Sequence, residues 1–163
     1  MTDSIYRAAE FSDDGRFRYS LERSWFQATS CERFITYVGL NPSTADAKQD
    51  DPTIRRLIGF TKSFGYEAFE IRNLYAVRGA DPSKLSHADL QDFSNHFHLS
   101  NCKGEIIVCC WGNRRNWPDW ERVVGWLQTW YGDKTYCFGE NKDGSPKHPL
   151  YLKSDTKLQR WLP

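Results

Sequence analysis

Residues 33–46 read RFITYVGLNPSTAD, and this stretch decides the fold. Residues 33–39 are mostly apolar or β-branched, which predicts a buried strand. The loop 40–46 follows, and Asp51-Pro52 then opens a helix, because Asp is a favoured N-cap and Pro suits the first helical position. The apolar stripe of this helix, which runs up to Gly65, consists of Ile54, Leu57, Ile58 and Thr61. A strand, a loop and a helix in this order form the unit from which parallel sheets are built.

The same alternation continues along the chain. Alternating apolar and charged residues over 16–23 predict an N-terminal edge strand. Further strands are predicted at 68–71 (running into 72–75), 106–111 and 134–138, and helices within 83–101, 117–131 and 155–162. We therefore expect a single α/β domain over residues 1–163. Its predicted architecture is a three-layer α/β/α sandwich with a central, mainly parallel four-stranded sheet and the extra edge strand.

The composition narrows the class of protein. The chain has 163 residues, of which 39% are apolar, and this suits one domain with one core. The formal net charge of +1 gives no overall basic field. The five cysteines include no Cys-x-x-Cys pair, and a helix would splay His96 and His98, so no metal or other cofactor is expected. No signal peptide or membrane-length apolar run occurs, so we expect a cytoplasmic monomer that does not bind membranes.

Polar residues follow the predicted parallel strands, at the sheet edge where ligands bind in such folds. Asn41, held by the stiff Pro42, would orient a water molecule, or it would form an Asx turn within its own loop. Asn73 would offer a donor and an acceptor to a pyrimidine edge, or it would cap a loop. His148 would donate a hydrogen bond to a developing negative charge, or it would be an ordinary surface or core histidine.

The order of four short motifs resembles the uracil-DNA glycosylase superfamily. They are Gly-Leu-Asn-Pro at 39–42, Asn-Leu-Tyr-Ala-Val-Arg at 73–78, Trp-Gly-Asn at 111–113 and His-Pro at 148–149. The resemblance spans residues 33–152. The longer patterns LNPSTAD (40–46), DDPTIRR (50–56) and HPLYL (148–152) also resemble an uncharacterised bacterial and phage domain family.

This resemblance implies a monofunctional DNA glycosylase that hydrolyses the N-glycosidic bond of a flipped, non-canonical pyrimidine and leaves an abasic site. Asn41 would place the attacking water, Asn73 would bind the base, and His148 would stabilise the anion that forms on it. Pro149, Leu150 and Tyr151 would push into the duplex. Residues expected to contact phosphates are Arg114, Arg115, Lys147 and Lys153. Residues expected to shape the substrate site are Gly39, Leu40, Pro42, Ser43, Thr44, Asp46 and Asp51.

The chain departs from that superfamily at three positions. Many members have Asp where this chain has Asn41, so Asp46 or Asp51 would supply a nearby carboxylate, unless Asp51 is only the helix cap. Leu150 stands where a phosphate-binding Ser is common. Ser43 replaces the Tyr that excludes C5-substituted pyrimidines, which leaves room for a C5-modified base such as those of phage DNA, unless another side chain fills the space.

Two other functions fit the same residues. The first is a non-catalytic module that binds a modified base or nucleic acid, which the missing carboxylate at position 41 favours. The second is an N-glycosidase acting on free nucleosides or nucleotides, which the modest net charge permits. A glycosylase would serve either DNA repair or antiviral defence. The absence of a Gly-rich phosphate loop argues against an NTPase.

Overall fold

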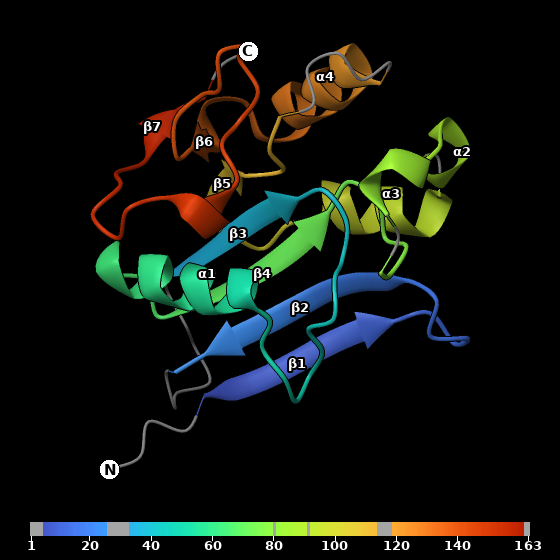
Figure 1. Ribbon diagram of the computed structural model, residues 1–163, viewed down its shortest axis with the longest axis horizontal. Helices are drawn as coiled ribbons and strands as arrows, with labels where there is room; N and C mark the ends of the chain where they lie inside the picture. Colours follow the sequence, from blue (N-terminus) through green and yellow to red (C-terminus); the bar gives the residue numbers. More distant parts are fainter. Residues whose placement is uncertain (1–4, 26–32, 80, 91, 114–118, 162–163) are drawn as a thin grey trace.

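The computed structural model describes residues 5–25, 33–79, 81–90, 92–113 and 119–161, which form a seven-stranded sheet flanked by helices (Figure 1). The strands are β1 Tyr6–Phe11, β2 Arg18–Ser24, β3 Phe34–Gly39, β4 Ala68–Asn73, β5 Ile106–Cys109, β6 Thr135–Cys137 and β7 Gln159–Arg160. The helices are α1 Pro52–Ser63, α2 His87–Leu90, α3 Phe93–Ser100 and α4 Trp120–Tyr131. Short 3₁₀ helices are η1 Pro82–Lys84, η2 Gly132–Lys134 and η3 Pro149–Tyr151.

The sheet is mixed, with the strand order β1-β2-β4-β3-β5-β6-β7. The four central strands β4, β3, β5 and β6 are parallel to one another. The pairings of β1 with β2, of β2 with β4 and of β6 with β7 are antiparallel. The predicted α/β class is therefore confirmed, whereas the predicted mainly parallel, four-stranded sheet is wrong. The parallel centre follows from its strand–helix units, and the antiparallel strands extend it at both edges.

Both ends of the chain differ from the prediction. The predicted edge strand at 16–23 corresponds to β2, but β2 lies inside the sheet because β1 covers its outer side. The helix predicted at 155–162 is wrong, because β7 forms there and the Trp161 backbone N–H donates to the Thr135 carbonyl at 3.0 Å. The extended backbone places Trp161 in the core, with its ring centroid 5.1 Å from that of Trp111.

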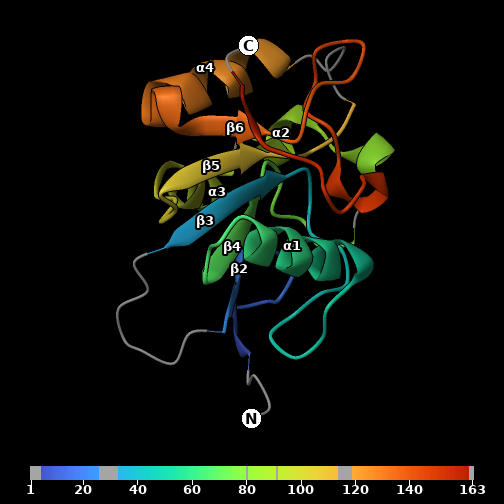
Figure 2. The same cartoon turned by 90° about the vertical axis from the view of Figure 1, so that its left-hand side faces the viewer.

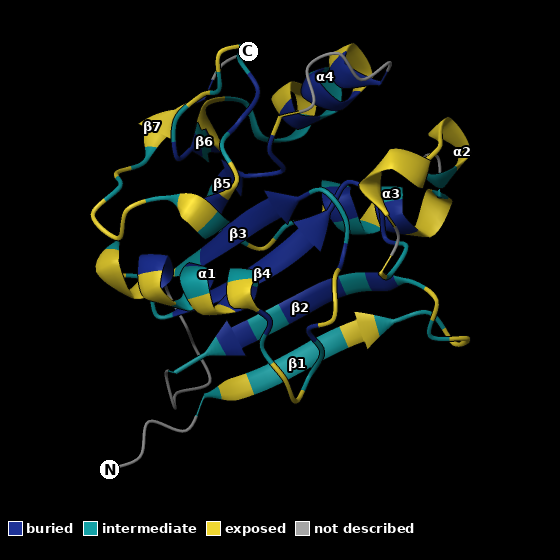
Figure 3. Cartoon of the chain, viewed as in Figure 1, coloured by how far each residue is buried: buried dark blue, intermediate teal, exposed yellow. Residues whose placement is uncertain are grey.

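Two apolar cores lie on opposite faces of the sheet. Helix α1 covers one face, and α3 and α4 cover the other (Figure 2). The central strands β3 and β4 are buried along nearly their whole length (Figure 3). Cys109 belongs to the core under α3 and α4, and Cys110 to the core under α1, so these neighbouring thiols are buried on opposite faces of the sheet. In the described residues, no helix has the length and apolar composition needed to cross a membrane.

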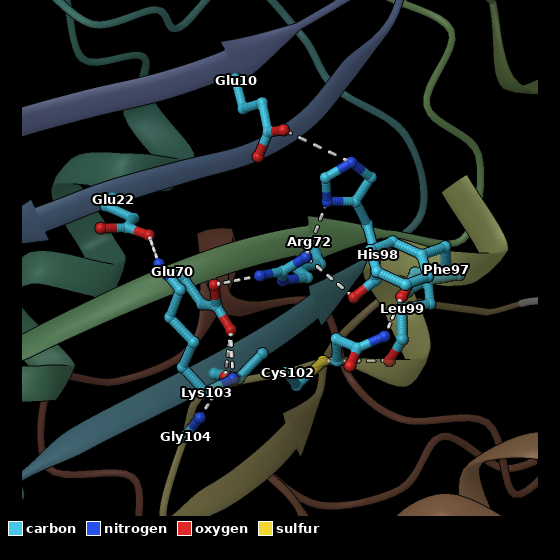
Figure 4. A network of polar contacts seen from close by, with 12 residues as sticks. Glu10, Glu22, Glu70, Arg72, Phe97, His98, Leu99, Cys102, Lys103 and Gly104 are labelled. Atoms are coloured by element: carbon cyan, nitrogen blue, oxygen red, sulfur yellow. Dashed lines mark hydrogen bonds and ion pairs between the residues drawn. The ribbon is translucent and has the colours of Figure 1, made fainter. Parts of the chain in front are cut away.

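A buried polar network joins β4 to α3 beneath the end of the sheet (Figure 4). The fully buried Glu70 carboxylate accepts hydrogen bonds from Thr36 Oγ1 at 2.8 Å and from the Lys103 backbone N–H at 2.7 Å. It also pairs with Arg72 Nη2 at 2.8 Å, and Arg72 Nη1 donates to the His98 carbonyl at 2.8 Å. These bonds fasten the end of α3 to β4 immediately before Asn73.

This network predicts a large stability difference between two glutamates. Glu70→Gln should lower the free energy of unfolding by about 3–5 kcal/mol, because it leaves the Arg72 guanidinium buried without its counter-charge. Glu22→Gln, which removes a more exposed pair with Lys103, should cost about 1 kcal/mol or less. Urea denaturation of both variants measures the difference, and equal losses would contradict this account of the network.

Candidate active site

A pocket of about 350 Å³ opens at the edge of the sheet where the parallel strands β3, β4 and β5 end. Its walls come from the loops after these strands, from the start of α1, from β2 and from the start of η3. The lining residues are Arg18, Gly39, Leu40, Asn41, Ser43, Asp51, Thr53, Ile54, Ile71, Asn73, Pro82, Cys110, Trp111, Asn113, His148 and Pro149. The volume falls in the range of small-molecule sites.

The pocket brings together most of the predicted central residues. Asn41, Asn73 and His148, which are distant in the sequence, line one cavity. Of the residues expected to shape the substrate site, Gly39, Leu40, Ser43 and Asp51 also line it, whereas Pro42, Thr44 and Asp46 do not. Arg114 and Arg115, predicted to contact phosphates, lie outside the described residues.

Asn73 is held rigidly at the end of β4. Its side chain is 2% exposed, and its Nδ2 has no hydrogen-bond partner among the described residues. Asn95 Nδ2, from α3, donates to the Asn73 and Leu74 carbonyls at 3.0 Å each. Gly39 lies opposite Asn73 in the β3–β4 pairing, and a β-carbon at position 39 would lie 2.8 Å from Asn73 Oδ1. A buried amide donor beside a cavity is available to a hydrogen-bond acceptor on a ligand.

The loop that carries Asn41 is fixed by backbone hydrogen bonds to the segment after β4. The Leu74 N–H donates to the Gly39 carbonyl and the Tyr75 N–H to the Leu40 carbonyl, each at 2.9 Å. The Gly79 N–H donates to the Pro42 carbonyl at 3.0 Å. The positions of Asn41 and Asn73 are therefore coupled through the backbone.

Asp51 serves as the helix cap and also lines the pocket. Its Oδ1 accepts from the Ile54 backbone N–H at 2.8 Å, as the sequence predicts for an N-cap, and its Oδ2 accepts from Ser43 Oγ. Asp51 is buried and is the one carboxylate among the described residues that line the cavity. Asp46 instead closes a turn: its Oδ1 accepts from the Lys48 and Gln49 N–H groups, and these bonds lower the pKa of Asp46.

His148 stands at the start of η3, is exposed to solvent and lines the same pocket. Its Nδ1 accepts from the Leu150 backbone N–H at 3.3 Å, so in the neutral ring the proton is assigned to Nε2. Partial burial in the pocket wall lowers the pKa of His148, an effect that the nearby Asp51 carboxylate opposes. The imidazole is thus mainly neutral at pH 7 and able to donate from Nε2.

Two contacts hold the His148 segment in place. The Gly112 N–H, after β5, donates to the Pro146 carbonyl at 3.0 Å, and a β-carbon at Gly112 would lie 3.5 Å from His148 Cβ. Arg56 of α1 donates from Nη2 to the Leu152 carbonyl on the other side of η3. The loop after β5 and helix α1 therefore clamp this segment over the pocket.

The predicted DNA-contacting residues separate into two groups. Pro149 is buried and lines the pocket, so it does not project from the surface as the predicted wedge requires. Tyr151 is 91% exposed and Leu150 is partly exposed. Lys147 is partly exposed and Lys153 exposed, and neither lines the pocket. These four residues do not line the cavity. Lys147 directly precedes His148 in the chain, and Leu150, Tyr151 and Lys153 follow it.

Sequence analysis assigned no site role to six residues that line the pocket, namely Arg18, Thr53, Ile54, Ile71, Pro82 and Cys110. Thr53 follows the helix-opening Asp51-Pro52 pair, so its position beside the pocket could have been found from that signal. Arg18 belongs to β2, which the alternating apolar and charged residues predicted to be an edge strand. No local sequence signal indicated that Arg18 lies at the site. In the part of the chain that the structure describes, no group of three or more His, Cys, Asp or Glu side chains is arranged to hold a metal ion.

Residues 18–150 match the family described as "Protein of unknown function (DUF1643)", and the chain belongs to this family. No curated protein and no solved structure matches the chain. The matched segment begins at Arg18 and includes Asn41, Asn73 and His148.

The close approach of Gly39 to Asn73 gives a testable prediction. Gly39→Ala should lower the free energy of unfolding by about 1–3 kcal/mol and displace the Asn73 side chain, since the new β-carbon would lie 2.8 Å from its Oδ1. Gly125→Ala in α4 is the matched control, because its β-carbon would meet nothing within 4 Å; it should raise stability by about 0.5–1 kcal/mol. Urea denaturation and the Asn73 side-chain amide NMR signal measure both effects. An unshifted Asn73 signal in Gly39→Ala would contradict the prediction.

Proposed function

We propose that this protein is a DNA glycosylase that hydrolyses the N-glycosidic bond of a flipped, non-canonical pyrimidine. The observation that carries the proposal is the convergence of Asn41, Asn73 and His148 in one pocket of about 350 Å³. The sequence resemblance implies complementary roles for these residues: Asn41 for the attacking water, Asn73 for the base and His148 for the leaving group. A concave site with amide and imidazole donors suits a base removed from the stack.

Asn73 binds the base edge. Its buried Nδ2 donates to a carbonyl oxygen of the pyrimidine, and its Oδ1 accepts from a ring N–H. A donor that is already buried gives up little hydration when the base enters, so the new hydrogen bond favours binding. Trp111 and Ile71 contribute apolar surface to the same cavity, against which the base packs.

His148, Asn41 and Asp51 take part in the cleavage of the glycosidic bond. The bond between the sugar carbon and the base nitrogen breaks, and its electron pair leaves with the base, whose oxygen accepts a hydrogen bond from His148 Nε2. Asn41 orients a water whose oxygen bonds to the resulting oxocarbenium-like sugar carbon. The negative charge of Asp51 stabilises this cationic centre, and the water proton passes to Asp51 or to solvent while the base anion takes up a proton.

Ser43 shapes the substrate preference. Its hydroxyl is held by Asp51, and the small side chain leaves open the part of the pocket that a Tyr would fill. We therefore assign a C5-substituted pyrimidine as the substrate class. Bases of this kind occur in modified phage DNA, which connects the proposed activity with defence as well as with repair.

A second function, binding without catalysis, has one observation in its favour. Position 41 is an amide, and both oxygens of Asp51 already accept protein hydrogen bonds, from Ile54 and from Ser43. A carboxylate engaged in this way is a weaker proton acceptor than a free one. A module that recognises a modified base would need only Asn73 and the pocket walls.

An abasic-site assay tests the proposal. Oligonucleotides with uracil, 5-hydroxymethyl pyrimidines or glucosylated pyrimidines are incubated with the protein and then cleaved with alkali. We expect cleavage with at least one C5-substituted base, its loss in Asn41→Ala, and a decrease of about 10²–10³-fold in His148→Ala. Asn101→Ala and His96→Ala, whose side chains do not line the pocket, should retain activity.

Three results would contradict parts of this account. Full activity of Asn41→Ala would remove the assigned role of the residue. Preference for plain uracil over every C5-substituted base would overturn the inferred substrate class. Tight binding of modified DNA without abasic product, even after long incubation, would support the binding module. For a glycosylase and for a binding module alike, a fall in DNA affinity with rising salt concentration would show that the protein contacts phosphates.

A further inference from the structure

An irregularity in β2 turns Arg18 toward the pocket. In the pairing of β1 with β2, Glu10 lies opposite Ser20 but Phe11 lies opposite Arg18, so Tyr19 is an extra residue in the ladder. Such a bulge reverses the alternation of side chains at that point. Tyr19 stacks on His98 of α3 at 4.6 Å between ring centroids, whereas Arg18 reaches the Ala45 carbonyl in the loop before α1.

The Arg18 guanidinium is buried and forms no ion pair with a carboxylate among the described residues. Arg18 is 2% exposed; its Nη1 donates to the Ala45 carbonyl at 2.6 Å, and its Nε has no hydrogen-bond partner among the described residues. Burial lowers the pKa of Arg18 to about 10, an effect that Asp51 opposes and that Arg78 and Arg23 strengthen. The side chain therefore remains a cation at pH 7.

Arg23 on the same strand shows what a structural arginine looks like here. It is also fully buried, but it forms an ion pair with Asp50 at 2.8 Å and donates to the Glu22 and Asp46 carbonyls. No ion pair within the described residues involves Arg18, and Arg18 lines the pocket. Burying a cation without a directly paired carboxylate is unfavourable for stability, and the charge of Asp51, which lines the same pocket, offsets only part of this cost.

We propose that Arg18 forms an anion subsite of the pocket, which binds a negatively charged oxygen group carried by the ligand. The group is a carboxylate on the base or a phosphate of the nucleotide. Both present acceptor oxygens that suit a guanidinium, and Thr53, which lines the same cavity, adds a hydroxyl group. The inference rests on the proposed function only in taking the ligand to be a nucleotide or its base.

Calorimetric binding of small ligands tests the subsite without any catalytic step. The ligands are 2′-deoxyuridine, 5-carboxy-2′-deoxyuridine and 2′-deoxyuridine 5′-monophosphate. We expect at least one anionic ligand to bind tenfold or more tightly than the neutral nucleoside, and the identity of that ligand distinguishes a base carboxylate from a phosphate. This preference should disappear in Arg18→Gln. It should persist in Arg55→Gln, which removes an exposed arginine of α1 that does not line the pocket.

The comparison among ligands in the unaltered protein keeps the test valid if Arg18→Gln fails to fold. Equal affinities of the neutral and anionic ligands, or no binding by any of them, would overturn the subsite. A preference for anions that survives in a folded Arg18→Gln protein would also overturn it. If Arg18-dependent anion binding occurs but no DNA yields abasic sites, the glycosylase proposal fails while the subsite stands.

Discussion

In the parallel pairing of β3 with β4, Gly39 lies directly opposite Asn73, and the Asn73 side chain fills the space that a β-carbon at position 39 would need. The remaining geometry of the pocket follows from this contact. The loop after β3 leaves the sheet at Gly39 and is bonded to the segment after β4, which fixes Asn41 relative to Asn73. The Glu70–Arg72 pair and Asn95 then hold the end of β4 from the side of α3.

The antiparallel strands and the last loop complete the walls around this parallel centre. The bulge at Tyr19 brings the charge of Arg18 from β2 to the cavity, and the Gly112 and Arg56 contacts hold the segment that carries His148. The cavity thus combines four different groups: the buried Arg18 cation, the Asp51 carboxylate that caps α1, the Asn73 amide and the mainly neutral His148 imidazole. These groups differ in charge and in hydrogen-bonding capacity, so the site can distinguish chemically different parts of one ligand.

Local sequence signals predicted the parallel centre of the fold and much of the site. The helix cap at Asp51 and the strand ends before Asn41 and at Asn73 could be predicted, because these features depend on residues nearby in the sequence. Local signals did not predict the strand pairings at the edges of the sheet. The pairing of β2 with β4, the pairing of β1 with β2 and the strand before Trp161 depend on long-range contacts that override local preference. Arg18 was missed for the same reason, since a bulge is defined by the partner strand.

The proposed function requires Asn73 and His148 to bind the same flipped nucleotide. Its most direct test is the structure of the protein bound to an oligonucleotide in which a 2′-fluoro sugar prevents cleavage of the modified nucleotide. We expect the base in this pocket, with one carbonyl oxygen at hydrogen-bond distance from Asn73 Nδ2 and another close to His148 Nε2. A nucleotide that stays stacked in the DNA, or a base bound away from both residues, would contradict it.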